Sequence, residues 1–140
     1  MSQTSDSKAL TAVVKVDISP GELLDKITIL QIKSERIEDQ DKNRNVMIEL
    51  EVLETAFSQS LTMSDKMSEL TASLKQVNQA LWDIEDDIRA CERAQDFGPE
   101  FIKLARAVYQ TNDRRAALKA EINELCGSDL QEEKSYADYD

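Results

Sequence analysis

Side chains that can bind anions or metal ions gather on two segments of the sequence, at residues 82–89 and 109–115. Arginines bind phosphate or carboxylate through paired N–H donors, acidic groups hold hard cations such as Mg²⁺, and aromatic rings stack on ligands. The residues concerned are Trp82, Asp83, Glu85, Asp86, Arg89, Tyr109, Asn112, Arg114 and Arg115. They predict either a ligand-binding site or a polar layer that fixes the register of two helices.

The two segments come together if residues 63–95 and 99–126 form an antiparallel helical hairpin that turns at Gly98. Apolar residues in both segments recur every three or four positions, which places them on one face of a helix. In the first segment the series runs without interruption through Met63, Met67, Leu70, Leu74, Val77, Leu81, Ile84, Ile88 and Cys91. A series of this length predicts that other helices lie against it.

The apolar series of the second segment is interrupted by polar residues at Thr111 and Arg115. A buried arginine is costly unless a carboxylate pairs with it. In the expected hairpin, Arg115 lies beside residues 81–85, so we expect it to bind Glu85 or Asp83.

A helix start is clearly marked at Ser19. Ser19, Pro20 and Glu22 form a capping box with proline in the first helical position. Glu22, Asp25 and Lys26 then lie on the first turns of this helix. Together with Glu35 and Glu38 further along, Glu22 and Asp25 loosely resemble the Mg²⁺-binding acidic pairs of all-α nucleotide pyrophosphohydrolases. Helix capping and ion pairs along the helix explain the same residues without a metal.

The whole pattern predicts an all-α fold, a four-helix antiparallel bundle formed by a single domain over residues 12–127. The expected helices cover residues 20–38, 45–61, 63–95 and 99–126, and residues 39–45 are expected to form a connecting turn or a frayed helix end. Residues 13–18 alternate between apolar and charged, which predicts a short strand that pairs within the chain or with another copy, or else an extended arm.

The two ends of the chain differ in composition from the helical region. Residues 1–11 are rich in serine and threonine, and we expect them to be mobile. Residues 128–140 are acidic, which predicts a solvated tail. In an alternative arrangement, Tyr136 and Tyr139 anchor the tail against the helices.

Composition narrows the range of functions. The net charge of −11 disfavours nucleic acid and anionic membrane surfaces as partners. Histidine is absent, which removes the side chain best suited to proton transfer near neutral pH. The two cysteines form no C-x-x-C motif, and no apolar run is long enough to span a membrane, so we expect a cytoplasmic protein.

Residues 18–37 resemble the opening of a family of small, uncharacterised bacterial proteins classified as a domain of unknown function. The matching motif is S-x-G-E-x-x-D-K-x-x-I-L-x-I-K, which begins at Ser19 and includes Glu22, Asp25 and Lys26. Residues 77–86, 112–116 and 132–136 are similar to later blocks of the same family. The resemblance implies an all-helical protein, brings no established activity, and loosely associates the chain with polysaccharide or glycosyltransferase contexts.

Two functional hypotheses follow. In the first, the chain is a non-enzymatic helical interaction protein, a homodimer with a possible further protein partner, and has no catalytic residues, metal site or cofactor. In the second, it is a ligand-binding bundle or metal-dependent hydrolase that acts on a phosphorylated metabolite, nucleotide or nucleotide sugar, with Mg²⁺ as the cofactor.

Overall fold

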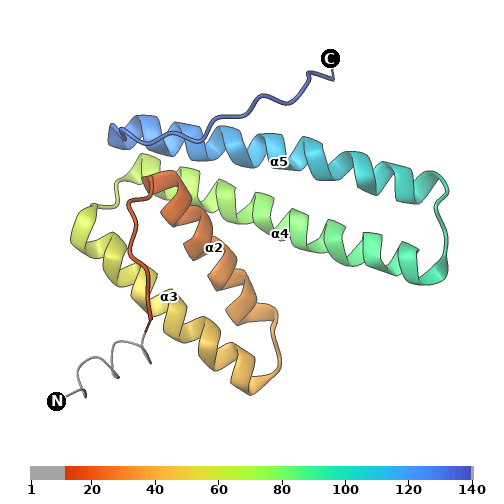
Figure 1. Ribbon diagram of the computed structural model, residues 1–140, viewed down its shortest axis with the longest axis horizontal. Helices are drawn as coiled ribbons and strands as arrows, with labels where there is room; N and C mark the ends of the chain where they lie inside the picture. Colours follow the sequence, from red (N-terminus) through yellow and green to blue (C-terminus); the bar gives the residue numbers. More distant parts are fainter. Residues whose placement is uncertain (1–11, 140) are drawn as a thin grey trace.

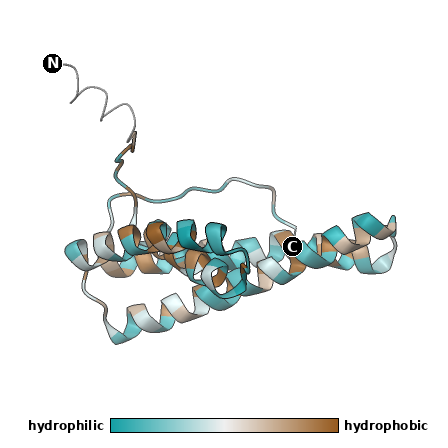
Figure 2. Ribbon diagram, turned by 90° about the horizontal axis from the view of Figure 1, so that it is seen from below, coloured by the Kyte–Doolittle hydropathy of each residue, from teal (hydrophilic) through white to brown (hydrophobic). Residues whose placement is uncertain are grey.

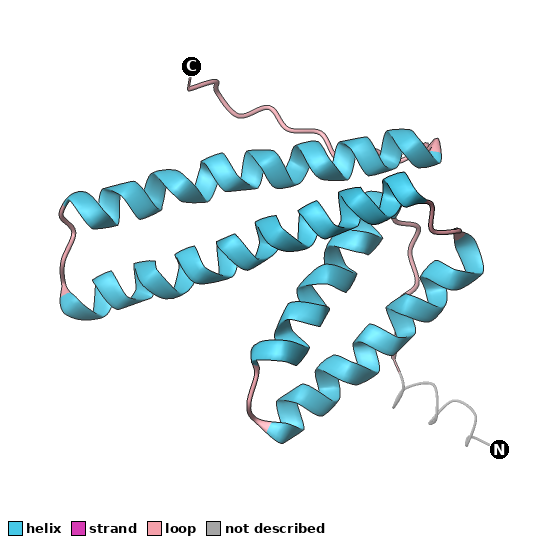
Figure 3. Cartoon of the chain, turned by 180° about the vertical axis from the view of Figure 1, so that it is seen from behind, coloured by secondary structure: helices cyan, strands magenta, loops and turns pink. Residues whose placement is uncertain are grey.

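The computed structural model describes residues 12–139, and it consists of four helices joined by short connections. The helices are α2 (Pro20–Arg36), α3 (Gln40–Ser60), α4 (Asp65–Ala94) and α5 (Pro99–Cys126). The predicted all-α fold is therefore confirmed (Figure 3). The mobility expected for residues 1–11 concerns a segment outside the described residues.

The helices form two antiparallel hairpins that cross at a steep angle (Figure 1). The longer hairpin consists of α4 and α5, and the shorter one of α2 and α3. Helix α2 is the central element, because it lies against each of the other three helices. Residues of α2 can therefore contact both helices of the long hairpin.

Local sequence signals explain where the helices begin. The hydroxyl of Ser19 accepts a hydrogen bond from the backbone N–H of Glu22, and Pro20 occupies the first turn, as the capping box predicts. The side chains of Asp39 and Ser64 cap α3 and α4 in the same way.

The connection between α2 and α3 is confined to residues 37–39, so most of the segment 39–45 is helix end and not connecting turn, since α3 begins at Gln40. Asp39 caps this early start, and the Asn43 side chain donates hydrogen bonds to the carbonyl oxygens of Ser34 and Ile37. These bonds satisfy carbonyl groups at the end of α2 that have no partner within the helix. Two of the polar residues that predicted a turn, Asp39 and Asn43, thus cap two adjoining helix ends.

The strand predicted over residues 13–18 does not form, and none of residues 12–139 belongs to a strand. Residues 12–18 are instead an extended arm that leads into α2 and points away from the helices (Figure 2). The arm is apolar yet open to solvent, with Val13 78%, Val14 85% and Val16 70% exposed. A strand needs a second segment for its backbone hydrogen bonds, and the described part of this chain does not place one beside the arm.

The hydrophobic core lies where α2 crosses the long hairpin. Leu24, Leu74 and Ile122 come from three different helices and are almost completely buried there. The apolar series of α4 is buried only from Met67 to Val77, and its later members, from Leu81 onward, are half-buried. The far end of the hairpin is covered less because α2 does not reach it (Figure 1).

Candidate functional site

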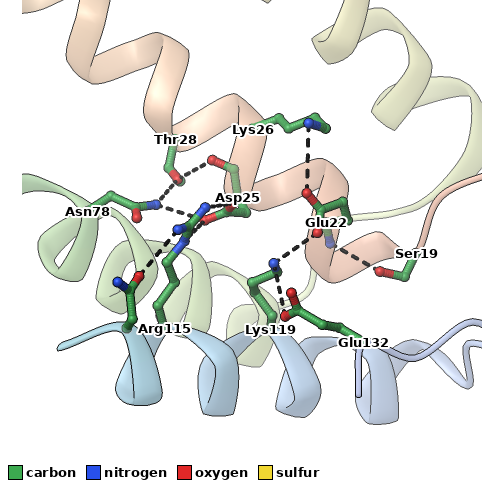
Figure 4. Close-up of polar contacts among 10 residues, drawn as sticks. Ser19, Glu22, Asp25, Lys26, Thr28, Asn78, Arg115, Lys119 and Glu132 are labelled. Carbon is green, nitrogen blue, oxygen red and sulfur yellow. Dashed lines mark hydrogen bonds and ion pairs between the residues drawn. The ribbon is translucent and has the colours of Figure 1, made fainter. Parts of the chain in front are cut away.

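A charged pair between Asp25 and Arg115 lies at the centre of the helix crossing (Figure 4). The guanidinium of Arg115 donates two hydrogen bonds to the Asp25 carboxylate, with an Nε to Oδ1 distance of 2.9 Å. The Asp25 side chain is 1% exposed, whereas that of Arg115 is 29% exposed. Two parallel bonds between a guanidinium and a carboxylate fix both the distance and the orientation of the two groups.

Two further residues complete the surroundings of Asp25. The amide of Asn78, on α4, donates hydrogen bonds to Asp25 Oδ1 and to the hydroxyl of Thr28, each at 3.0 Å. Thr28 in turn donates to the backbone carbonyl of Asp25 at 2.8 Å. The carboxylate is therefore bound by side chains from α4 and α5 while it sits on α2.

These contacts decide the protonation state of Asp25. Burial raises the pKa of Asp25, but the hydrogen bonds from Arg115 and Asn78 and the positive charges of Arg115 and Lys119 outweigh it and lower the pKa below its ordinary value. The bond to Asp25 raises the pKa of Arg115 despite partial burial. Both groups are therefore charged at neutral pH.

A second buried cation, Lys119, lies one helical turn after Arg115. Its ammonium group contacts Glu22 on α2 at 2.8 Å and Glu132 in the C-terminal tail at 3.2 Å. Burial lowers the pKa of Lys119, but the hydrogen bonds to Glu22 and Glu132 more than compensate and raise it. Glu22 therefore has two roles: its backbone N–H donates to the capping hydroxyl of Ser19, and its carboxylate pairs with Lys119 of α5 (Figure 4).

The start of α2 also touches α5 through backbone atoms. The N–H of Gly21 donates a hydrogen bond to the Asn123 side-chain oxygen at 2.7 Å. A β-carbon at position 21 would lie 2.5 Å from the carbonyl oxygen of Lys119. Only glycine allows this close approach, so Gly21 in the motif is required by packing.

The tail after α5 runs back along that helix (Figure 1). Besides the contact of Glu132 with Lys119, the ring of Tyr139 lies edge-on against Tyr109, with centroids 5.2 Å apart. Tyr136 is 81% exposed. The tail thus shares features of both arrangements considered for it: Tyr139 and Glu132 contact the helical region, whereas Tyr136 does not anchor the tail and residues 129–139 are exposed.

A pocket of about 320 Å³ opens beside the charged pair. Its walls are largely apolar, and a few polar groups from α4 and α5 reach it. The lining residues are Ile29, Ile32, Asn78, Leu81, Trp82, Glu85, Val108, Asn112 and Arg115. An apolar pocket with a few convergent polar groups is the usual form of a small-molecule site.

The structure brings four of the predicted site residues to this pocket, namely Trp82, Glu85, Asn112 and Arg115. The prediction that Arg115 binds Glu85 or Asp83 is wrong, because Arg115 binds Asp25. Asp83 binds Arg36 instead, at 2.6 Å, and Glu85 binds Arg89, at 2.8 Å. Both of these pairs lie on the surface.

The remaining predicted residues do not join the pocket. Asp86 and Arg114 are exposed, and Tyr109 contacts the tail. Of the three motif residues, Asp25 is buried, Glu22 is half-buried, and Lys26 is exposed and lies 3.7 Å from Glu22. The motif thus supplies the two carboxylates of α2, Asp25 and Glu22, that pair with Arg115 and Lys119 of α5.

A buried polar cluster is formed by Asp25, Thr28, Asn78, Arg115, Lys119 and Asn123. The predicted site residues did not include Thr28, Asn78, Lys119 or Asn123. A signal was present, because Arg115, Lys119 and Asn123 recur every fourth residue and so share one face of α5. That face is the one that meets the start of α2.

The chemistry open to the cluster is limited by its internal pairing. Every buried side-chain nitrogen and oxygen of the described residues has a hydrogen-bond partner. Within residues 12–139 there is also no group of three or more His, Cys, Asp or Glu side chains placed to hold a metal ion. Side-chain hydrogen bonds and ion pairs of the cluster connect α2 with α4 and α5.

No helix of the described residues is long and apolar enough to cross a membrane. Neither the curated proteins nor the solved structures include a significant match to the chain. A family model does match, over residues 14–139, which include the motif, the pocket and most of the tail. The chain therefore belongs to the family described as a family of unknown function, DUF6165.

Proposed function

We propose that the chain is a helical interaction protein that assembles with a second copy of itself through the extended arm. The observation that carries this proposal is the exposure of an apolar, extended segment next to a well-formed core. Val14 and Val16 are 85% and 70% exposed, and in the described residues their backbone groups have no strand beside them. An extended segment with free N–H and C=O groups readily pairs with another strand.

The internal pairing of the polar cluster supports the same proposal. Asp25 and Arg115 bind each other, and Lys119 binds Glu22 and Glu132, so each of these charges is already paired within the chain. The two free cysteines are consistent with a reducing, cytoplasmic location. We therefore expect a stable helical protein whose contacts with partners lie outside the cluster.

The test is the molar mass of the full chain in solution, measured by light scattering or sedimentation over a range of concentrations. We expect a dimer that dissociates on dilution. Val16→Glu should yield a monomer, because it places a charge in the proposed contact. Val52→Glu is the matched control, since Val52 on α3 is similarly exposed, at 61%, and should leave the dimer intact. A wild-type chain that is monomeric at every concentration contradicts the proposal.

A second candidate function is the binding of a small molecule in the pocket beside Arg115. The specific observation is the meeting of the Trp82 ring, the Asn112 amide and the partly exposed guanidinium at an apolar cavity of about 320 Å³. The guanidinium carries further N–H donors besides the two that bind Asp25. Phosphorylated sugars, nucleotides and nucleotide sugars combine an anion with polar rings that these groups can contact.

This candidate is tested by the melting temperature of the protein in the presence of such compounds, with and without Mg²⁺. A ligand that binds only the folded protein raises the melting temperature. Trp82→Leu should abolish the shift and leave the charged pair in place, because the side-chain hydrogen bonds to the Asp25 carboxylate come from Asn78 and Arg115. Arg114→Gln removes an exposed arginine that does not line the pocket, so it controls for non-specific attraction of anions and should leave the shift unchanged. The absence of any shift across these compounds counts against a ligand of this kind.

A further inference from the structure

The arm carries a sequence pattern that is complementary to itself. In an extended chain, Val14, Val16 and Ile18 point to one face, and Lys15 and Asp17 point to the other. One face of the arm is thus entirely apolar, and the other carries one positive and one negative charge. All of these residues are exposed, and the arm points away from the helices of its own chain (Figure 2).

We infer that two copies of the chain pair their arms as antiparallel strands centred on Val16. This inference rests on the proposed homodimer and specifies its contact. In this register Val16 lies opposite Val16 of the other copy, and Val14 lies opposite Ile18. Lys15 lies opposite Asp17, and the two-fold symmetry of the pair repeats this contact. Directly opposite residues of unlike charge stabilise antiparallel strands.

Other registers do not place apolar residues opposite apolar residues and Lys15 opposite Asp17 at the same time. Centring the pair on Lys15 or on Asp17 places two like charges opposite each other, and a parallel arrangement brings each residue beside its own copy. A shift by one residue sets Val16 opposite Asp17 and so mixes the apolar and charged faces. The helix cap at Ser19 and Pro20 ends the extended segment and limits the pairing to the arm.

The test uses charge exchange in the full chain, with the dissociation constant of the dimer measured by sedimentation. Lys15→Asp places an acid opposite Asp17, and Asp17→Lys places a lysine opposite Lys15. Each should weaken the dimer about tenfold, because a favourable cross-strand pair becomes a repulsive one at two equivalent positions. Mixing the two variants, or combining both substitutions in one chain, restores unlike pairs and should restore the wild-type dissociation constant.

These variants also separate pairing from general electrostatics. Lys15→Asp makes the chain more acidic and Asp17→Lys makes it less acidic, so simple repulsion between two acidic chains would shift the dissociation constant in opposite directions. Antiparallel pairing centred on Val16 instead raises the dissociation constant of both variants. Circular dichroism should show unchanged helix content, because neither residue belongs to a helix.

The possible failures are distinct. If the wild-type chain dimerises and Val16→Glu is monomeric, but the charge variants dimerise normally, the arm is the contact and the inferred register is wrong. If all arm variants dimerise like the wild type, both the register and the use of the arm are wrong, although the chain still self-associates. A wild-type chain that stays monomeric overturns both the inference and the proposed homodimer.

Discussion

Arg115 on α5 donates two parallel hydrogen bonds to the carboxylate of Asp25 on α2, although the two residues are 90 positions apart in the sequence. The Asn78 amide adds a bond from α4 to the same carboxylate. One buried acid on α2 thus connects to both α4 and α5, two helices that are distant from it in the sequence. These polar contacts help to fix the orientation of α2 on the long hairpin, together with the apolar packing of Leu24, Leu74 and Ile122.

Arg115→Met should destabilise the fold by about 3 kcal/mol, because it leaves the buried carboxylate of Asp25 without its counter-charge. Arg89→Met is the matched control, since Arg89 pairs with Glu85 at the surface, and it should cost less than about 1 kcal/mol. The measurement is the free energy of unfolding in urea. The double variant Asp25→Leu/Arg115→Met should recover much of the loss, and equal effects of the two single arginine variants would show that the buried pair has no special role.

Stability should fall in acid through Asp25. The folded protein holds the pKa of Asp25 below its ordinary value of about 4, so the unfolded chain takes up this proton at a higher pH than the folded one. The contribution is fully present above about pH 4 and is lost as the pH falls from there toward the lower pKa of the folded state.

Asp25→Asn should therefore be less stable than the wild type at neutral pH and lose less stability as the pH falls below about 4, where the wild-type contribution is progressively lost. Urea unfolding at a series of pH values provides the comparison. If the two proteins lose stability in parallel below pH 4, the carboxylate does not carry this pH dependence.

Gly21→Ala should destabilise the fold by about 1–3 kcal/mol, because the added methyl group collides with the backbone of α5. The new β-carbon would lie 2.5 Å from the carbonyl oxygen of Lys119 and 2.9 Å from the Asn123 side chain. Gly98→Ala is the control, since its nearest obstacle is an Asp96 side-chain oxygen at 3.2 Å. Thermal unfolding of both variants distinguishes them, and equal melting temperatures would contradict the close approach of α2 and α5.

Glu132→Gln should release the tail without unfolding the helices. Glu132 contributes one of the two carboxylates that contact Lys119, and its side chain is 43% exposed, so its loss should cost less than about 1 kcal/mol. Hydrogen exchange and limited proteolysis should accelerate over residues 128–139. Its exposed neighbour provides the control, since Glu133→Gln should leave both rates unchanged. A tail equally protected in both variants would mean that other contacts hold it.

The helices themselves could be predicted from local sequence because their causes are local. The three- and four-residue spacing of apolar side chains on α4, the capping box at Ser19, and Gly98 and Pro99 at the start of α5 each act within a few residues. The sequence also indicated that Arg115 needs a carboxylate, because that requirement follows from the cost of burying a charge. It offered the nearest acids on the facing helix, Glu85 and Asp83, as partners.

The choice of Asp25 depended on the tertiary structure. Helix α2 crosses the long hairpin and brings its own carboxylate to Arg115, while Asp83 and Glu85 stay at the surface with Arg36 and Arg89. Sequence spacing within a hairpin contains no information about a third helix that arrives from 90 residues away. In the same way, the alternation over residues 13–18 determined an extended arm, but a strand forms only where another segment pairs with it. Local spacing therefore determined the elements, and packing between distant segments decided which polar groups meet.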